Sequence, residues 1–125
     1  MVLTGCLGLG STMLLKSADL DDARNHFIAS CIGCHAFACN KSGPALGSLF
    51  GRKSGSAEGF DSHSEELKNY GVIWTEETLN TFLADPGAVI KFGEMARLGK
   101  IEDKDLRNQM IQYLKTEDPS INLCG

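Results

Sequence analysis

The sequence has little basic character. It holds 12 lysine and arginine residues against 16 aspartate and glutamate residues, which gives a formal net charge of -4 and a pI near 5.3. A nucleic-acid-binding domain normally presents an excess of positive charge to the phosphate backbone. The charge balance therefore argues against a nucleic-acid ligand and favours a neutral or basic partner.

Long hydrophobic runs are also scarce. Residues 1–18 are apolar and rich in small side chains, but they are too few to span a bilayer and lack the basic start of a secretory signal. They contain Leu3-Thr4-Gly5-Cys6, which resembles a bacterial lipoprotein cleavage box preceded by an unusually short segment. We expect residues 1–18 to form an extension outside the core, either associated with a membrane or as a packed or fraying tail.

The sequence shows no internal repeat and no convincing strand pattern. Its 125 residues, 42% hydrophobic and 22% charged, are typical of one soluble domain. We expect that domain to cover residues 19–118, with a C-terminal tail at 119–125. An all-α fold follows from the periodic segments that remain.

Three segments have the apolar periodicity of helices. The first, 19–30, has Asp19 as its cap and places Ala23 and Phe27 on one face. The second, 75–84, has Thr75 as its cap, Trp74 as a hydrophobic staple to Leu79, and an Asp85-Pro86 stop. The third, 104–115, follows Asp103 and precedes Pro119. Residues 36–70 show no sustained period, and a long irregular stretch in a small domain is typical of a buried cofactor.

Five cysteines are an odd number, so a closed set of disulfides cannot use them all. Two of them belong to the motif Cys31-Ile32-Gly33-Cys34-His35, which is the attachment pattern of c-type haem. Thiols three residues apart on a helical turn can add to the two vinyl groups of one porphyrin. The next residue then lies beneath the iron, where a neutral imidazole nitrogen can bind it.

Two other chemistries share parts of this motif. A thioredoxin-like redox pair usually follows a strand, and no strand is expected before Cys31. A zinc site could recruit four nearby ligands, but closed zinc sites normally draw them from two separated pairs. These ligands would be Cys31, Cys34, His35 and Cys39.

Beyond the motif, the sequence resembles the class I, mitochondrial-type cytochrome c family over roughly residues 19–115. The matching segments are Gly43-Pro44-Ala45-Leu46, Leu49-Phe50-Gly51-Arg52-Lys53-Ser54-Gly55, Trp74-Thr75-Glu76-Glu77-Thr78-Leu79, Asp85-Pro86, Met95 and Tyr113-Leu114-Lys115. The resemblance implies the class I cytochrome c fold, in which three main helices and long loops wrap around one covalently bound haem. The Ala23 and Tyr113 positions would mark the crossing of the first and last helices.

The resemblance also implies roles for single residues. Met95 would be the second axial iron ligand opposite His35. Met95 is expected to lie in a non-helical stretch, Lys91-Phe92-Gly93-Glu94-Met95, whose first four residues depart from the family's usual Pro-Gly-Thr-Lys. The Pro44 carbonyl would accept a hydrogen bond from His35. Arg52 and Trp74 would hold a haem propionate.

Other positions depart from the family or remain unassigned. Phe82 occupies a position that often holds a tyrosine whose hydroxyl contacts the methionine sulfur. Ser62 or His63 falls near the propionate-binding tyrosine, and neither His63 nor His26 is assigned to the iron. Met13 and Met110 fit the role of core filler.

We therefore expect an electron-transfer protein of the respiratory chain rather than an enzyme, with a haem iron bound by His35 and Met95. Its partners would be redox proteins, either membrane respiratory complexes or a dehydrogenase. The alternatives are a fixed haem subunit of such a complex and, if Met95 is not a ligand, an open-site sensor or peroxidase. The expected compartment is the periplasm, with the mitochondrial intermembrane space as the alternative.

Two features bear on docking and redox state. Family lysines around the haem edge are replaced here by Gly87, Glu94 and Ile101, so steering by positive charge should be weak. Of the remaining cysteines, Cys6 with Cys124 is the expected disulfide, and Cys39 is expected to be buried and inert.

Overall fold

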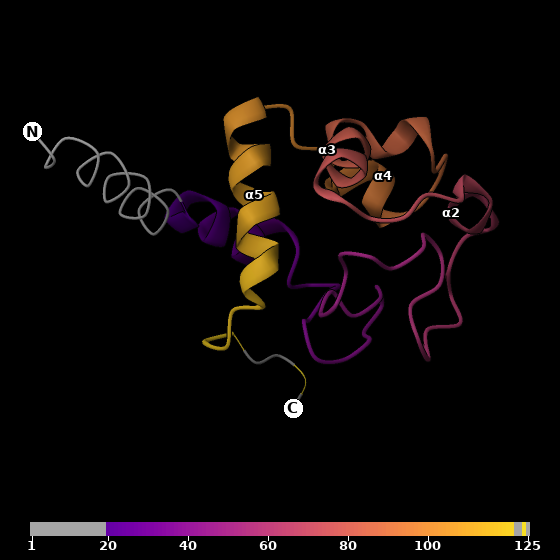
Figure 1. Cartoon of the computed structure of the whole chain (residues 1–125), viewed down its shortest axis with the longest axis horizontal. Helices are drawn as coiled ribbons and strands as arrows, with labels where there is room; N and C mark the ends of the chain where they lie inside the picture. Colours follow the sequence, from indigo (N-terminus) through magenta and orange to yellow (C-terminus); the bar gives the residue numbers. More distant parts are fainter. Residues whose placement is uncertain (1–19, 122–123, 125) are drawn as a thin grey trace, which may run out of the picture.

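The computed structural model describes residues 20–121 and Cys124. Residues 20–30 are helical and lead into a turn at 31–34. The other helices are α2 (Glu65–Tyr70), α3 (Glu76–Ala84), the short 3-10 helix η1 (Pro86–Ala88), α4 (Glu94–Leu98) and α5 (Lys104–Thr116). Figure 1 shows α5 beside the helix of residues 20–30, with α3 and α4 together at the other end of the view and long loops below them. Within the described residues there is no strand, only an isolated bridge between Lys53 and Ile73.

The helix of residues 20–30 and α5 join through small and aromatic side chains. Ala23 is fully buried and Phe27 is 1% exposed, on the face that the sequence predicted. The Phe27 ring lies 5.4 Å from that of Tyr113 on α5 and 5.2 Å from that of Phe37. This contact confirms the predicted pairing of the first and last helices.

Helix α3 begins where its capping residues satisfy the free backbone amides. The Thr75 hydroxyl accepts from Thr78 N at 3.1 Å, and the Thr78 hydroxyl accepts from Thr75 N at 2.8 Å. The helix ends at Asp85, before Pro86, and its inner face is buried. Helix α5 is capped by Asp103, whose side chain accepts from Asp105 N at 2.9 Å. Both helices match their predicted ranges to within one residue.

The stretch between 36 and 70 is less irregular than predicted, because it contains α2. Ser64 caps this helix, accepting from Leu67 N at 3.1 Å, and Gly71 ends it with a left-handed φ of 68°. Its six residues are too few to show a period, and Leu67 and Tyr70 are held by packing against the core. Tertiary contact rather than local pattern therefore determines α2.

The prediction that Met95 lies in a non-helical segment is wrong. Met95 is the second residue of α4, which starts after Gly93 reverses the chain with a φ of 115°. An ion pair between Glu94 and Arg97, 2.6 Å apart, joins residues one turn apart along this helix. A five-residue helix without a side-chain cap leaves little signature in a sequence.

The cysteine pairing also differs from the prediction. Cys39 and Cys124 form a disulfide, with their Cα atoms 5.8 Å apart. Cys39 is therefore not an inert thiol and Cys124 is not paired with Cys6, which lies outside the described residues together with Asp19 and Met13. Cys124 reaches Cys39 because the polar contacts of Asp118 and Ser120 reverse the chain direction after α5.

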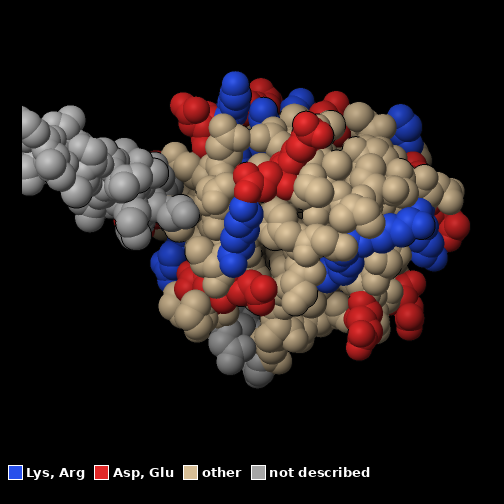
Figure 2. All heavy atoms as spheres, in the orientation of Figure 1, with Lys and Arg blue, Asp and Glu red and all other residues tan. Residues whose placement is uncertain are grey.

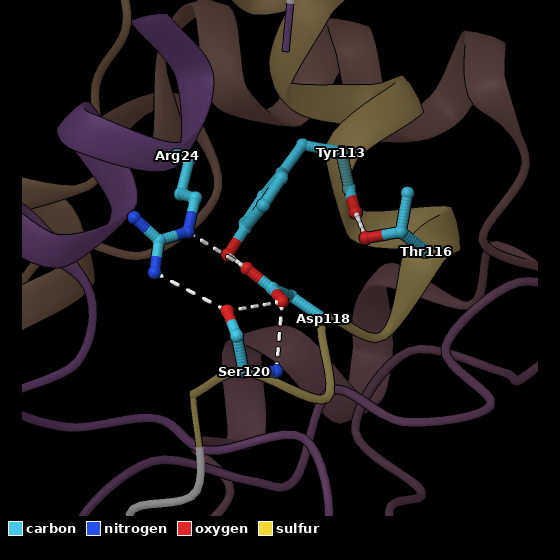
Figure 3. A network of polar contacts seen from close by, with 5 residues as sticks. All are labelled: Arg24, Tyr113, Thr116, Asp118 and Ser120. Atoms are coloured by element: carbon cyan, nitrogen blue, oxygen red, sulfur yellow. Dashed lines mark hydrogen bonds and ion pairs between the residues drawn. The ribbon is translucent and has the colours of Figure 1, made fainter. Parts of the chain in front are cut away.

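Asp118 is the centre of those contacts (Figure 3). Its Oδ2 accepts from the Tyr113 hydroxyl at 2.8 Å and from Arg24 Nε at 3.0 Å. Ser120 adds hydrogen bonds from its amide and hydroxyl to Asp118 Oδ1, and its hydroxyl accepts from Arg24. The tail is thus bound to the helix of residues 20–30 and to α5 at once.

Candidate functional site

The two motif thiols and the imidazole come from one continuous turn. Cys31 N donates to Phe27 O at 2.8 Å as the last turn of the first helix closes, and His35 N donates to Cys31 O at 2.9 Å. Cys31 and Cys34 are half-buried free cysteines and do not form a disulfide with each other. Burial, and then the neighbouring Cys34, raise the pKa of Cys31 to about 11, whereas a reactive redox thiol needs a lowered pKa.

His35 is held as a neutral imidazole. It is 8% exposed, and its Nδ1 lies 2.8 Å from the Pro44 carbonyl oxygen. Burial lowers the pKa of His35, the Pro44 hydrogen bond opposes that shift, and Arg52 and Lys41 lower the pKa further. A neutral ring that donates from Nδ1 keeps its lone pair on Nε2, which is the state that binds a metal.

The loop that carries Pro44 is fixed by backbone hydrogen bonds to the segment after the motif. Gly43 N donates to Cys34 O at 2.7 Å, Leu46 N to Ala36 O at 2.9 Å and Gly47 N to Phe37 O at 2.8 Å. The carbonyl acceptor for His35 is therefore part of a braced loop, and the ring orientation is set before any ligand binds.

Two adjoining cavities lie over the motif, with about 830 Å³ and 960 Å³ of empty space including their open mouths. Volumes of this order are those of sites for large organic cofactors. The residues common to both linings are Cys31, His35, Pro44, His63, Leu67, Met95 and Gly99. The first cavity is otherwise mainly apolar, walled by Phe27, Leu46, Leu49, Trp74, Leu79, Phe82, Leu83, Ile101, Met110 and Leu114.

These linings fit a haem. Two thiols, one imidazole nitrogen and one thioether sulfur face the same space, and the walls are apolar as a porphyrin requires. The zinc alternative fails because Cys39 is in a disulfide, and the described residues contain no group of three or more side chains arranged to hold a metal ion by themselves.

The remaining predicted site residues surround this space. Arg52 donates from Nη2 to Ala45 O at 2.8 Å, and burial lowers the pKa of its guanidinium. An anion bound beside this cation would oppose that effect of burial. Trp74 and Phe82 are each 5% exposed, with ring centroids 5.2 Å apart.

Some residues of the site escaped sequence reasoning. Leu67 on α2 and Gly99 after α4 line both cavities, and Met110, predicted as core filler, also lines the first. His63 lines both cavities and its Nε2 accepts from Ala57 N at 3.0 Å. Ile101 is 4% exposed, so it belongs to the core and not to a docking surface. Only the chain fold could reveal Leu67 and Gly99 as lining residues, because they come from segments without a distinctive motif, whereas the resemblance had already placed His63 near a propionate.

Comparison with known proteins supports the interpretation of these cavities as a haem site. No family model matches the chain. A cytochrome c type-1 of Ascaris suum is 35% identical over 105 residues, which cover 82% of this chain and 92% of the relative. A cytochrome c of Stellaria longipes is 39% identical over 106 residues, 82% of this chain and 96% of the relative. A cytochrome c2 of Blastochloris viridis is 41% identical over 88 residues, 68% of each chain.

The chain belongs to the class I cytochrome c family. It is an all-α electron-transfer protein, and like other cytochromes c it carries one covalently attached haem c with its iron. Ligation by one histidine and one methionine is typical of the family. In this cytochrome c, the expected donor residues Cys31, Cys34, His35 and Met95 all line the second of the two adjoining cavities.

Proposed function

We propose that Cys31 and Cys34 hold the haem through thioether bonds and that His35 and Met95 are the two axial ligands of its iron. The observation that carries this assignment is the pocket itself: His35, hydrogen-bonded to the Pro44 carbonyl, and Met95 line the same two cavities. When bound, the haem supplies a one-electron couple between ferrous and ferric iron. If His35 and Met95 both bind the iron, no open position would remain for a substrate, and the protein would act as a carrier and not as an enzyme.

The protein's own residues set the conditions for that couple. The Pro44 carbonyl fixes the His35 tautomer and increases the basicity of the ligating nitrogen. The thioether of Met95 is a weak donor, which favours reduced iron. Arg52 and Trp74 are proposed to hold a propionate. Phe82 supplies an apolar wall, without a hydroxyl to donate to the Met95 sulfur.

The test is the optical spectrum of the purified protein and of its Met95→Ala variant, in both oxidation states. The parent should show c-type haem bands and the weak long-wavelength band of methionine sulfur on ferric iron. Met95→Ala should keep its covalently attached haem, lose that band and bind carbon monoxide when reduced. Met110→Leu is the matched control, since Met110 lines the same cavity and should keep the sulfur band. If Met95→Ala binds no more carbon monoxide than the parent, Met95 is not the ligand. If the parent also lacks the sulfur band, an open-site sensor or peroxidase becomes the better assignment.

The protein is further proposed to exchange electrons with redox proteins, namely membrane respiratory complexes or a dehydrogenase. This exchange would take place at the mouth of the second cavity, the one of about 960 Å³. Phe92 is 86% exposed and Leu98 is 50% exposed, and both line that cavity. The charges beside them, Glu94 and Arg97, neutralise each other. On the face drawn in Figure 2, acidic and basic side chains are interspersed. Docking should therefore depend on apolar contact more than on long-range attraction.

Stopped-flow electron exchange at several ionic strengths tests this docking mode. Exchange with an oxidase that prefers basic cytochromes should be slow and should rise only modestly as salt is lowered. Phe92→Ser should slow exchange with the physiological partner, whereas Ile73→Ser is the control, because Ile73 is 47% exposed but lines neither cavity. A steep rise at low salt would contradict the proposal.

The working compartment is proposed to be the periplasm, with the mitochondrial intermembrane space as the alternative. The Cys39–Cys124 disulfide supports an oxidising compartment of either kind. The chain is proposed to comprise an extension at 1–18, a cytochrome c domain at 19–118 and a tail at 119–125. Membrane association is proposed to reside in residues 1–18. Among the residues that the structure describes, no helix is long and apolar enough to cross a bilayer.

A further inference from the structure

Each of the two proposed iron ligands lies against a glycine. A Cβ atom on Gly43 would lie 2.6 Å from His35 Cε1 and 2.9 Å from its Nδ1. A Cβ atom on Gly99 would lie 2.6 Å from Met95 Cε and 2.9 Å from its Sδ. Non-bonded carbon atoms pack best at about 3.5–4.0 Å, so neither position accepts a side chain while the ligand stays where it is.

Backbone conformation does not explain these glycines. Gly99 has φ -82° and ψ -10°, which any residue adopts, and Gly43 is not among the described glycines with positive φ. Since a left-handed turn does not require either glycine, we attribute each of them to the lack of room for a Cβ atom. At both positions a proposed ligand occupies that room.

We infer that Gly43 and Gly99 are positioning residues for iron ligation, since the side chain each of them lacks defines where the imidazole and the thioether lie. The inference rests on the proposed ligation by His35 and Met95. It assigns no chemistry to the glycines, which contact the ligands and not the iron.

The two positions should respond differently to an added methyl group. Met95 ends in a flexible thioether, so an alanine at 99 displaces the sulfur, and the close approach to Met95 O at 2.7 Å also shifts the last turn of α4. The His35 ring is anchored by the Pro44 carbonyl, one residue after Gly43, and cannot retreat without lengthening that hydrogen bond. An alanine at 43 should therefore disturb the ring and its acceptor together.

The chain supplies matched controls for each effect. Gly87 lies in the short helix η1, lines neither cavity and is not among the described glycines with positive φ, and an added Cβ there would meet only Asp85 Oδ1, at 3.4 Å. Gly93 precedes α4 with φ 115° and has no atom within 4 Å of an added Cβ. Gly87→Ala should thus be neutral for ligation, and Gly93→Ala should cost backbone strain without touching the Met95 sulfur.

The experiment compares holoprotein of the parent with Gly99→Ala, Gly93→Ala, Gly87→Ala and Met95→Ala. The readouts are the ferric sulfur band, the reduction potential, carbon monoxide binding and thermal unfolding. Gly99→Ala should lose most of the sulfur band, bind carbon monoxide and show a lower potential, with haem still attached. Gly93→Ala should lower the unfolding temperature and keep the band, and Gly87→Ala should match the parent.

A Gly99→Ala variant that keeps both band and potential overturns the inference for Gly99. If Met95→Ala also keeps the band, the ligand assignment fails first and the inference fails with it; if Met95→Ala alone loses it, only the positioning role is wrong. Gly43→Ala is an independent test that does not depend on α4 folding. Its His35 ring resonances in the reduced protein should move relative to both the parent and Gly87→Ala, and unchanged resonances would overturn the role of Gly43.

Discussion

At the scale of single residues, Asp118 carries more of the tertiary structure than its position near the C-terminus indicates. Its side chain is 13% exposed and contacts Arg24, Tyr113 and Ser120. The hydrogen bonds from Ser120, and those from Tyr113 and Arg24, lower the pKa of Asp118 to about 2, against the smaller opposing effect of burial. In turn, burial and the Asp118 contact raise the pKa of Tyr113, which therefore keeps its proton as the donor.

This lowered pKa predicts a pH-dependent contribution to stability. A carboxylate whose pKa is lowered by folding stabilises the protein above its unfolded pKa, near 4, and that contribution is lost as the pH falls through 2. Asp118→Asn should lower the free energy of unfolding at neutral pH by about 1 kcal/mol, since Arg24 is partly exposed and water screens the pair. The difference from the parent should shrink between pH 4 and pH 2.

Urea unfolding of the two proteins at several pH values measures this difference. Asp61→Asn is the control, because Asp61 is exposed. A difference between Asp118→Asn and the parent that stays constant down to pH 2 would mean that the Asp118 charge contributes nothing to stability.

At the scale of elements, α3 depends on its first turn. Thr75 and Thr78 exchange hydrogen bonds at the start of the helix, and the inner face that follows supplies Leu79, Phe82 and Leu83 to the pocket. The capped residues and the Asp85-Pro86 stop are local signals, so the boundaries of this helix could be predicted from the sequence. Helix α4 has no side-chain cap, so its start could not be predicted from the sequence.

Thr75→Ala should destabilise the protein by about 1 kcal/mol, whereas Thr75→Ser should restore most of that loss because a serine hydroxyl also caps. Thermal unfolding followed by circular dichroism measures both. Thr81→Ala is the matched control: its hydroxyl donates to Glu77 O inside the same helix and leaves the cap intact. Equal losses for Thr75→Ala and Thr81→Ala would show that the cap is not the important contact.

At the scale of the whole molecule, the disulfide between Cys39 and Cys124 links residues 85 positions apart. It holds the tail against the segment after the haem motif, where a hollow is lined by Ala36, Phe37, Ala38, Glu117, Asp118, Pro119, Ile121 and Cys124. Glu117, which ends α5 just before the tail, adds a second contact, its Oε2 accepting from Ser48 N at 3.1 Å. The described residues of the tail therefore lie beside the segment at 36–38.

Removing this link should matter for stability more than for ligation. The Cys39→Ser, Cys124→Ser double variant should lose about 2–4 kcal/mol of unfolding free energy, because the unfolded chain regains conformational freedom. The braced loop around Pro44 has its own backbone hydrogen bonds, so the sulfur band should persist. Peptide mapping without reduction should recover Cys39 joined to Cys124; recovery of Cys6 joined to Cys124 would contradict the pairing, and an unchanged unfolding free energy would contradict its energetic role.

The sequence by itself determined the parts of this cytochrome c that are local. The attachment motif, the capped boundaries of α3 and α5, and the apolar faces around Phe27 and Leu79 all follow from residues close together in the chain. Tertiary structure alone decided the pairing of Cys39 with Cys124, the helical state of Met95 and the burial of Ile101. These outcomes depend on which distant segments contact one another. Packing and side-chain contacts such as those of Asp118 determine this, and such contacts produce no periodic pattern in the sequence.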